Sequence, residues 1–187
     1  MLAFNQIGNL GRLGNQMFQY AACRSLALKN RTDVALMPGI ANHEFHGQKC
    51  LLLNFNLEYR FFNDQDYRRI IGNFLDSSNP DIALPKFNQI GDNTVIFGHF
   101  ENEKYFEFYK DVIRKDFTLP EYYTNKAKEV LSKYDNPAVI HIRLGDNLGD
   151  ARLMEDVDIN LRSIKELIPP KYDLLFVGGG RRTQDSN

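Results

Sequence analysis

The last third of the chain alternates apolar and helical segments in an order that constrains the fold more than any other feature of the sequence. An apolar run over Ala138–Ile142 predicts a buried strand, a helical pattern follows over Glu155–Leu167, and Asp173–Val177 is a second apolar run. Two strands joined through a helix form a βαβ unit, whose strands are parallel and whose helix covers one face of the sheet. The sequence therefore predicts an α/β fold.

The N-terminal part begins with the same alternation. Leu2–Ile7 is expected to form a short strand, a glycine-rich loop covers residues 8–14, and an apolar helical pattern runs from Asn15 to about Asn30. Asn15 is the expected N-cap of this helix. Other expected elements are strands over Val34–Met37, Leu51–Leu57, Glu58–Phe62 and Thr94–Phe100, helices over Asp64–Phe74, Glu103–Asp116 and Glu121–Tyr134, and loops at Asn79-Pro80 and Pro85.

Composition narrows the class of protein. Lys and Arg number 23 and Asp and Glu 24, so a net charge of −1 gives no general attraction to nucleic acid. The two cysteines, Cys23 and Cys50, exclude a disulfide framework and favour a reduced, cytoplasmic chain. The sequence shows neither a signal peptide nor an apolar run long enough to span a membrane.

The glycine-rich loop is the first candidate binding site. It reads GNLGRLGNQ from Gly8 to Gln16 and lies between a strand and a helix, where backbone N–H groups and the helix N-terminus favour a phosphate. Arg12 adds a fixed charge, and Asn15 and Gln16 add amide donors. The spacing matches neither a Walker loop nor the dinucleotide fingerprint. A tight turn before a capped helix is the alternative interpretation.

The second candidate site is the loop HIRLGD, which directly follows an apolar strand. In an extended segment His141 and Arg143 lie on the same side, at the strand end where parallel sheets bind ligands. The guanidinium of Arg143 suits a diphosphate, and Asp146 is able to accept a proton or to pair with Arg143. The alternative is a solvated ion pair at a strand end. His43 and His46 are a weaker metal candidate, because no third ligand accompanies them.

Three blocks of sequence resemble one family in the same order. GRLGNQMFQYAACRSLA (Gly11–Ala27) resembles the N-terminal signature of the α-1,2-fucosyltransferases, glycosyltransferase family 11. IFGHFENEKYFEFYKDVIRKDF (Ile96–Phe117) is similar to the central segment of that family, and AVIHIRLGDN (Ala138–Asn147) to its nucleotide-sugar motif, His-x-Arg-Arg-x-Asp. Residues 38–95 match only loosely.

The resemblance implies a GT-B-type glycosyltransferase with an N-terminal, acceptor-side α/β domain over 1–135 and the start of a Rossmann-like donor domain over 136–187. It implies transfer of L-fucose from GDP-fucose to a galactose-type hydroxyl of a glycan, with inversion and with neither a metal nor a cofactor. Arg143 and Asp146 take the catalytic positions. The expected donor-binding residues are Gly14, Asn15, Gln16, His141 and Arg143.

The sequence departs from the family pattern at two places. Leu144 replaces the second arginine of the motif, and GGGRRTQDSN follows Asp173–Val177 where the family continues with further strands. We therefore expect a C-terminally shortened donor domain, and a catalytically inactive carbohydrate- or nucleotide-binding module is the alternative to an active enzyme. The unfinished sheet edge makes a second copy of the chain a candidate partner, and a membrane surface is a further candidate for peripheral association.

Overall fold

A computed structural model describes residues 1–76, 80–142 and 171–178 of the chain. Contacts between Cα atoms divide the chain into two compact units, Met1–Tyr122 and Tyr123–Asn187. The division expected from the sequence, between residues 135 and 136, falls later, inside the second unit. Each unit is described by itself below.

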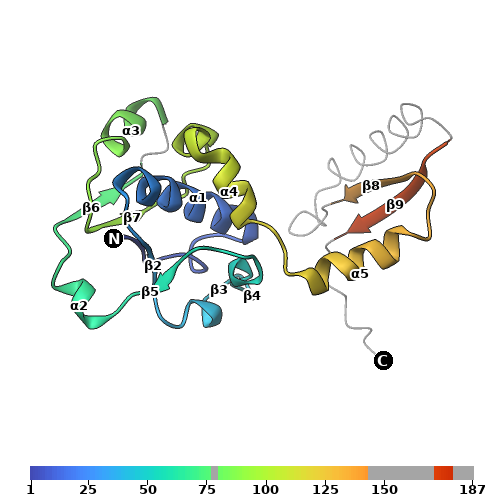
Figure 1. Ribbon diagram of the computed structural model, residues 1–187, viewed down its shortest axis with the longest axis horizontal. Helices are drawn as coiled ribbons and strands as arrows, with labels where there is room; N and C mark the ends of the chain where they lie inside the picture. Colours follow the sequence, from blue (N-terminus) through green and yellow to red (C-terminus); the bar gives the residue numbers. More distant parts are fainter. Residues whose placement is uncertain (77–79, 143–170, 179–187) are drawn as a thin grey trace. The chain divides into compact units, whose positions relative to one another are not determined.

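The first unit is built on a parallel sheet (Figure 1). Its five strands follow the order β5-β2-β1-β7-β6, and every neighbouring pair is parallel. Leu2 of β1 lies opposite Val34 of β2 on one side and Thr94 of β7 on the other. The strands are β1 (Leu2–Phe4), β2 (Val34–Leu36), β5 (Arg60–Phe61), β6 (Gly72–Leu75) and β7 (Thr94–Phe97).

Helices and short turns connect these strands. The long helix α1 (Leu13–Asn30) follows β1 directly and packs against β1 and β2. The remaining elements of the first unit are α2 (Asp64–Tyr67), α3 (Pro80–Phe87), α4 (Lys110–Asp116), the 3₁₀ turns η1 (Ile40–Asn42), η2 (Leu52–Asn54), η3 (Glu103–Tyr105) and η4 (Glu107–Tyr109), and the antiparallel pair β3 (Glu44–Phe45) and β4 (Gln48–Lys49).

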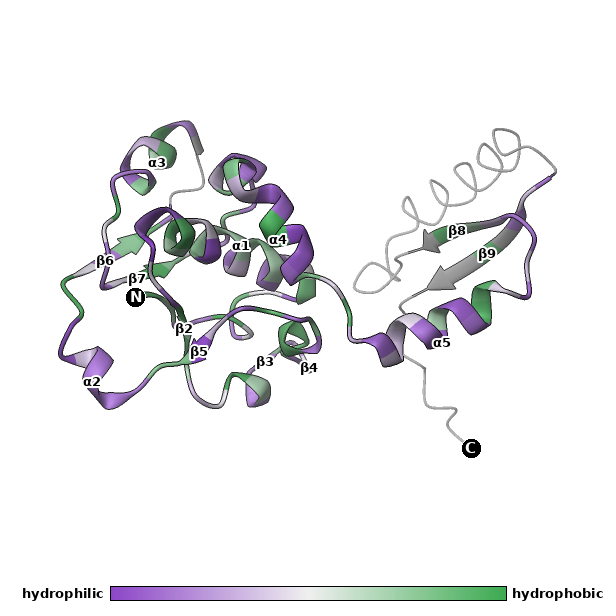
Figure 2. Cartoon of the chain, viewed as in Figure 1, coloured by the Kyte–Doolittle hydropathy of each residue, from purple (hydrophilic) through white to green (hydrophobic). Residues whose placement is uncertain are grey.

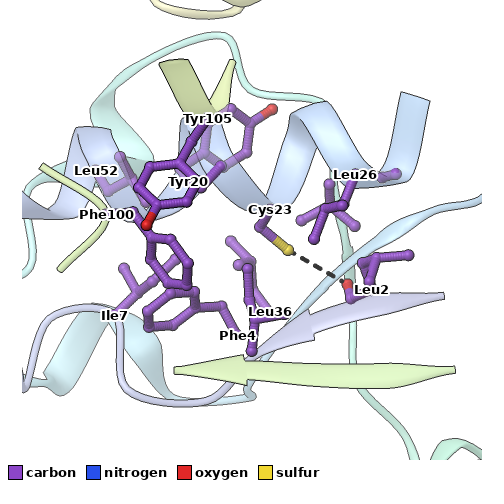
Figure 3. Close-up of a cluster of buried hydrophobic side chains, with 14 of the residues drawn as sticks. Leu2, Phe4, Ile7, Tyr20, Cys23, Leu26, Leu36, Leu52, Phe100 and Tyr105 are labelled. Atoms are coloured by element: carbon purple, nitrogen blue, oxygen red, sulfur yellow. Dashed lines mark hydrogen bonds between the residues drawn. The ribbon is translucent and has the colours of Figure 1, made fainter. Parts of the chain in front are cut away.

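The main core lies between the sheet and α1. Side chains alternate across a strand, so Leu2 and Phe4 of β1 point to one face while Ala3 points to the other. Figure 3 shows Leu2 and Phe4 beneath Tyr20 and Cys23 of α1, with the Cys23 Sγ 3.6 Å from the Leu2 carbonyl. Full burial of each large apolar side chain contributes about 1.5–3 kcal/mol. This core fixes α1, and therefore the glycine-rich loop before it, on the sheet.

A smaller cluster covers the opposite face. Met1, Ala3, Ala35 and Phe62 are buried there. The two alanines leave room for the segment that carries Phe62 to approach the strands closely. In Figure 2 the strands β6 and β7 carry hydrophobic colours, whereas the exposed helix α2 is mostly hydrophilic. The central strands β1 and β2 are buried on both faces, as is typical of parallel sheets, whereas the edge strands leave Phe61 and Leu75 exposed.

A buried polar network fixes α4 beside α1. The Tyr20 hydroxyl donates to Asp116 Oδ2 over 2.9 Å and accepts from the Glu58 backbone N–H over 3.1 Å. Arg24 Nε donates to the same carboxylate over 2.9 Å. Desolvation, reinforced by the Asp116 charge, raises the pKa of Tyr20, so this phenol stays protonated. The network sets the distance between the two helices.

The second unit contains β8 (Pro137–Ile142), β9 (Asp173–Gly178) and, from Tyr123 onward, the helix α5 (Glu121–Leu131). The strands β8 and β9 pair in parallel from Pro137 opposite Asp173 to Ile142 opposite Gly178. The predicted parallel pairing of these two strands is confirmed. The part of the HIRLGD segment from Arg143 onward and the predicted helix over residues 155–167 lie outside the described residues.

The region between residues 51 and 87 differs most from the sequence prediction. The helix expected over Asp64–Phe74 ends at Tyr67, and Gly72–Leu75 instead forms β6, because pairing with β7 brings Phe74 against the core. Pro80 and Pro85, both expected to mark loops, lie in the helix α3, which buries Ala83 and Phe87. In each case burial of apolar side chains outweighs local propensity. The strand expected over Leu51–Leu57 was also wrong, since η2 lies there.

One further helix is divided. Glu103–Asp116 forms η3, η4 and α4 in succession, because Phe106 adopts φ −140° and ψ 6°, outside the helical region. Within residues 1–76, 80–142 and 171–178, none of the helices combines the length and apolar character that a bilayer span needs.

Candidate functional site

The ends of three strands meet at one edge of the first unit. Because β1, β6 and β7 are parallel, the segments that follow them leave the sheet at the same carboxyl edge. These segments are the glycine-rich loop before α1, Asp76 after β6, and the turn Gly98–Asn102 after β7. This is the edge at which open parallel sheets bind ligands.

Two glycines of the loop are required by backbone geometry. Gly8 and Gly11 adopt φ of +88° and +95°, in the left-handed region that other residues avoid. A Cβ on Gly8 would lie 2.8 Å from His43 Cβ, and one on Gly11 would lie 2.4 Å from Asn15 Cβ. Gly14 differs from both, because it lies inside α1 and its Cβ would meet no atom within 4 Å.

Two buried glutamines hold the loop from beneath. Gln16 Nε2 donates to the Gly11 carbonyl over 3.3 Å, and Gln19 Nε2 donates to the Leu10 carbonyl over 2.6 Å. A trans peptide directs its N–H opposite to its C=O, so the N–H groups of Gly11 and Arg12 point away from these glutamines. The loop thereby presents donor groups beside the N-terminus of α1.

The Gln16 side chain is committed to this support. It is 1% exposed, and its Oε1 accepts from the Leu51 backbone N–H over 3.2 Å and lies 3.5 Å from Cys50 Sγ. Any effect of Gln16 on a donor would therefore act through the position of the loop. Gln19 is fully buried, and its Oε1 has no hydrogen-bond partner in the part of the chain that the structure describes.

The start of α1 differs from the prediction. The helix begins at Leu13 with Arg12 as its N-cap, so the expectation that Asn15 caps the helix was wrong. The Asn15 side chain projects from the first turn instead, because the loop winds into the helix before this residue. The first turn contains no acidic residue, and no side chain caps it. Its partial positive charge therefore remains for an anion.

Asn15 bonds to Glu101, and His99 lies near the same carboxylate; sequence reasoning missed both residues. The Asn15 Nδ2 donates to Glu101 Oε1, and His99 Nδ1 lies 3.8 Å from the same oxygen. The side chains of His99 and Glu101 are about half exposed, at 51% and 55%. The signal was present in the sequence, because Gly98-His99-Phe100-Glu101 follows an apolar strand in the same way that the HIRLGD segment does.

Asp76 fixes the turn that carries His99 and Glu101. Its carboxylate accepts from the Phe100 backbone N–H over 3.0 Å and from the Tyr105 hydroxyl over 2.6 Å. Gly98 has φ +141°, and a Cβ there would lie 2.2 Å from Asp76 Cβ. Desolvation and the Asp76 carboxylate raise the pKa of Tyr105, so the phenol keeps the proton that it donates.

The remaining predicted site residues belong to the second unit. His141 is part of β8, and its side chain lies outside the described part of the structure, as do Arg143 and Asp146. The structure places Gly14, Asn15 and Gln16 in the first turn of α1, where Asn15 bonds to Glu101 and Gln16 supports the loop from beneath. That Asn15 and Arg143 share one diphosphate stays a prediction.

Other candidate centres carry little support among the described residues. His43 Nδ1 lies 2.8 Å from the Ile7 carbonyl, so this ring helps to position the loop rather than pairing with His46. In residues 1–76, 80–142 and 171–178, no three His, Cys, Asp or Glu side chains are grouped to hold a metal ion. Cys23 and Cys50 are both free and buried, and burial raises the pKa of each thiol.

Comparison with known proteins places the chain beside glycosyltransferases. No protein-family profile matches it. An α-1,2-colitosyltransferase of Escherichia coli is 28% identical over 163 residues, which cover 78% of this chain and 56% of the relative. The chain therefore spans about half the length of this curated relative.

The similar solved structures are fucosyltransferases. The fucosyltransferase NodZ from Bradyrhizobium matches with a TM-score of 0.54 and 13% identity, over 98% of this chain and 73% of NodZ. A crystal of NodZ α-1,6-fucosyltransferase soaked with GDP-fucose gives a TM-score of 0.51 and 12% identity, over 98% and 72% of the two chains. The expected resemblance is confirmed in these terms: the chain is similar in sequence to an α-1,2-colitosyltransferase and shares the GT-B-like α/β fold of the NodZ fucosyltransferases.

Proposed function

We propose that the protein is a galactoside α-1,2-fucosyltransferase, which transfers L-fucose from GDP-fucose to a galactose-type hydroxyl of a glycan. The glycine-rich loop carries this proposal. Its carbonyls are tied down by Gln16 and Gln19, its N–H groups face the other way, and the adjoining helix start has no acidic side chain. Such an arrangement suits the diphosphate of a nucleotide sugar.

The transfer makes one bond and breaks one. The acceptor oxygen bonds to C1 of the sugar, the bond from C1 to the β-phosphate oxygen breaks, and GDP leaves with the bonding electrons. Negative charge grows on the departing diphosphate, and we assign its stabilisation to Arg143 together with the N–H groups of the loop, without a metal. We propose inversion at C1, with attack on the face opposite the diphosphate.

The proton of the acceptor hydroxyl needs a base. Asp146 is the candidate from the sequence motif, and Glu101 is the candidate from the first unit, where it lies beside Asn15 at the carboxyl edge. His141 flanks Arg143 in the sequence motif and is assigned to donor binding with Gly14 and Asn15.

A second donor has its own support. The curated sequence relative is named for the transfer of colitose with α-1,2 linkage. Colitose is fucose without its 3-hydroxyl group, so GDP-colitose presents the same diphosphate and sugar ring to the loop. A donor comparison separates the two, since only a site that bonds the 3-hydroxyl would prefer fucose by a large factor.

Mass-spectrometric detection of fucose transfer from GDP-fucose to a galactose-terminated oligosaccharide tests the proposal. Arg143→Lys should reduce turnover on the order of 100-fold, because a point charge does not replace the planar fork. The exposed Arg68 offers the matched control, and Arg68→Lys should retain full turnover. Unchanged turnover in Arg143→Lys would remove the assigned role of Arg143.

Ligand protection separates an enzyme from a binding module. GDP should raise the melting temperature, whereas ADP should not, because the proposed site is specific for the guanine nucleotide. Binding of GDP-fucose without any transfer would support the binding-module alternative. Equal protection by ADP and GDP would contradict a dedicated GDP-sugar site.

A further inference from the structure

The first unit contains a hollow between α1 and the segment η3–α4 to which the proposed function assigns no ligand. Its volume is about 370 Å³. That size lies at the lower end of the range for small-molecule sites. Its apolar lining consists of Met17, Phe18 and Ala21 from α1, with Phe106, Ile113 and Phe117 on the other side.

Charged side chains of both signs complete the lining. Glu103 and Glu107 contribute carboxylates, whereas Lys110 and Arg114 contribute cations, and all four are exposed. An anionic ligand would be repelled by the glutamates and a cationic ligand by Lys110 and Arg114. A neutral ligand with many hydroxyl groups would use both kinds, because hydroxyls donate to carboxylates and accept from ammonium and guanidinium groups.

The aromatic rings favour the same kind of ligand. Phe18 and Phe106 both line the hollow and pack against each other, with ring centroids 5.9 Å apart and planes inclined at 54°. The face of an aromatic ring carries partial negative charge. It therefore attracts the C–H groups on the apolar face of a sugar ring, whose hydroxyls project around the edge toward polar neighbours.

The hollow adjoins the candidate site. Gly14 is part of its lining, and the next residue, Asn15, bonds to Glu101 at the carboxyl edge. On the other side Glu103, also in the lining, lies two positions after Glu101. A molecule that reaches the carboxyl edge and extends along α1 would therefore enter the hollow.

We infer that this hollow binds the non-reacting sugars of a neutral acceptor oligosaccharide while its terminal galactose-type sugar lies at the carboxyl edge. The inference rests on the proposed function for the identity of the reacting sugar. It assigns the selection of acceptor length to α1 and α4, and it leaves the donor to the glycine-rich loop.

The experiment compares two acceptors, methyl β-galactoside and a neutral galactose-terminated tetrasaccharide. Phe106→Ala should raise the KM for the tetrasaccharide about tenfold or more, with little change for methyl β-galactoside or for GDP-fucose. Phe108→Ala is the matched control, because Phe108 lies two positions after Phe106, in η4, is 88% exposed and is not part of the lining. Equal changes for both acceptors, or none, would overturn the inference.

A second pair of variants avoids any effect on folding. Lys110 and Lys115 are both exposed on α4, but only Lys110 lines the hollow. Lys110→Gln should weaken binding of the tetrasaccharide severalfold, whereas Lys115→Gln should leave this binding unchanged. If the hollow strengthened binding of octyl β-galactoside more than binding of the tetrasaccharide, the occupant of the hollow would be an apolar aglycone. The inference would then be wrong.

Binding measurements keep this inference separate from the proposed function. Saturation-transfer NMR should detect the tetrasaccharide on the wild-type chain and lose it in Phe106→Ala, whether or not fucose is transferred. Binding without transfer would retain the hollow as a glycan site and remove the proposed enzyme activity. Transfer of fucose to methyl β-galactoside, with no improvement in KM from added sugars, would support the proposed enzyme activity and remove the hollow as a glycan site.

Discussion

Arg60 and Asp66 form the best-defined ion pair of the first unit. The guanidinium contacts both carboxylate oxygens, with Nη1 2.7 Å from Oδ2 and Nη2 2.8 Å from Oδ1. The Asp66 side chain is 2% exposed and also accepts from the Asn63 backbone N–H over 2.9 Å. These hydrogen bonds stabilise the charged carboxylate and lower the pKa of Asp66 to about 2, and Arg60 makes the largest contribution.

This pair predicts a defined pH dependence. A carboxyl with a lowered pKa stabilises the fold above its unfolded pKa of about 4, and this contribution is lost as the pH falls toward about 2. The difference in free energy of unfolding between wild type and Asp66→Asn should therefore shrink over that interval, as measured by urea denaturation. Asp33, the 70% exposed partner of Arg60, provides the control. Asp33→Asn should change stability little at any pH, and a similar pH-dependent difference for both variants would contradict the prediction.

Single residues also show where reading the sequence was insufficient. Asn15 and the glycine-rich loop were found because glycines beside a helix start carry a recognisable physical meaning. Gln16 and Gln19 support that loop, yet a buried glutamine inside a helix has no distinguishing pattern, since only the fold reveals which carbonyl it reaches. Glu101 follows a recognisable apolar strand, but its partner Asn15 is 86 positions away, so the sequence did not show that the two residues meet.

The junction between the loop and α1 makes opposite demands on two of its glycines. Gly11 has φ +95° and no space for a side chain, whereas Gly14 lies in the first turn of α1 with open space where a Cβ would be. The first is a requirement of the turn. The second leaves the helix without the stabilisation that alanine would provide.

These two positions predict substitutions of opposite sign. Gly14→Ala should increase the free energy of unfolding by up to about 1 kcal/mol, because alanine loses less backbone entropy in a helix. Gly11→Ala should decrease it by more than about 1 kcal/mol, since the backbone conformation is strained and the Cβ overlaps Asn15. Thermal unfolding of both variants provides the measurement. Destabilisation by Gly14→Ala would contradict the prediction, because it would mean that other atoms occupy the space beside Gly14.

Among whole elements, those with strong periodicity were predicted best. The helix α1 and the strands β1, β2, β7, β8 and β9 were located to within a few residues, because each is an uninterrupted apolar pattern between breakers. The short strand β6 and the helix α3 were not, since their apolar residues gain meaning only from the core that they reach. Pro85 reads as a breaker in sequence, yet it lies inside α3.

At the scale of the molecule, the first unit carries its own core. Both described clusters of buried apolar residues, around Leu2 and around Met1, draw their members from Met1–Tyr122. A five-stranded parallel sheet whose central strands are buried on both faces satisfies the requirements of an independent folding unit.

We therefore expect a fragment of residues 1–122 to fold without the rest of the chain. It should unfold cooperatively in urea and keep a near-ultraviolet circular dichroism signal from packed aromatic residues such as Tyr20 and Tyr105. A broad, non-cooperative transition would show instead that the remaining residues are needed to complete this core. The full chain, measured in parallel, supplies the reference.

The two stripes of α1 have separate tasks. Gln16 and Gln19 face the loop and the sheet, whereas Met17, Phe18 and Ala21 line the hollow. Sequence drift in one stripe leaves the other in place, because a helix turns consecutive side chains about 100° apart. Under the proposed assignment, a handful of substitutions on the stripe that lines the hollow would alter the choice of acceptor, while the support of the glycine-rich loop would be inherited intact.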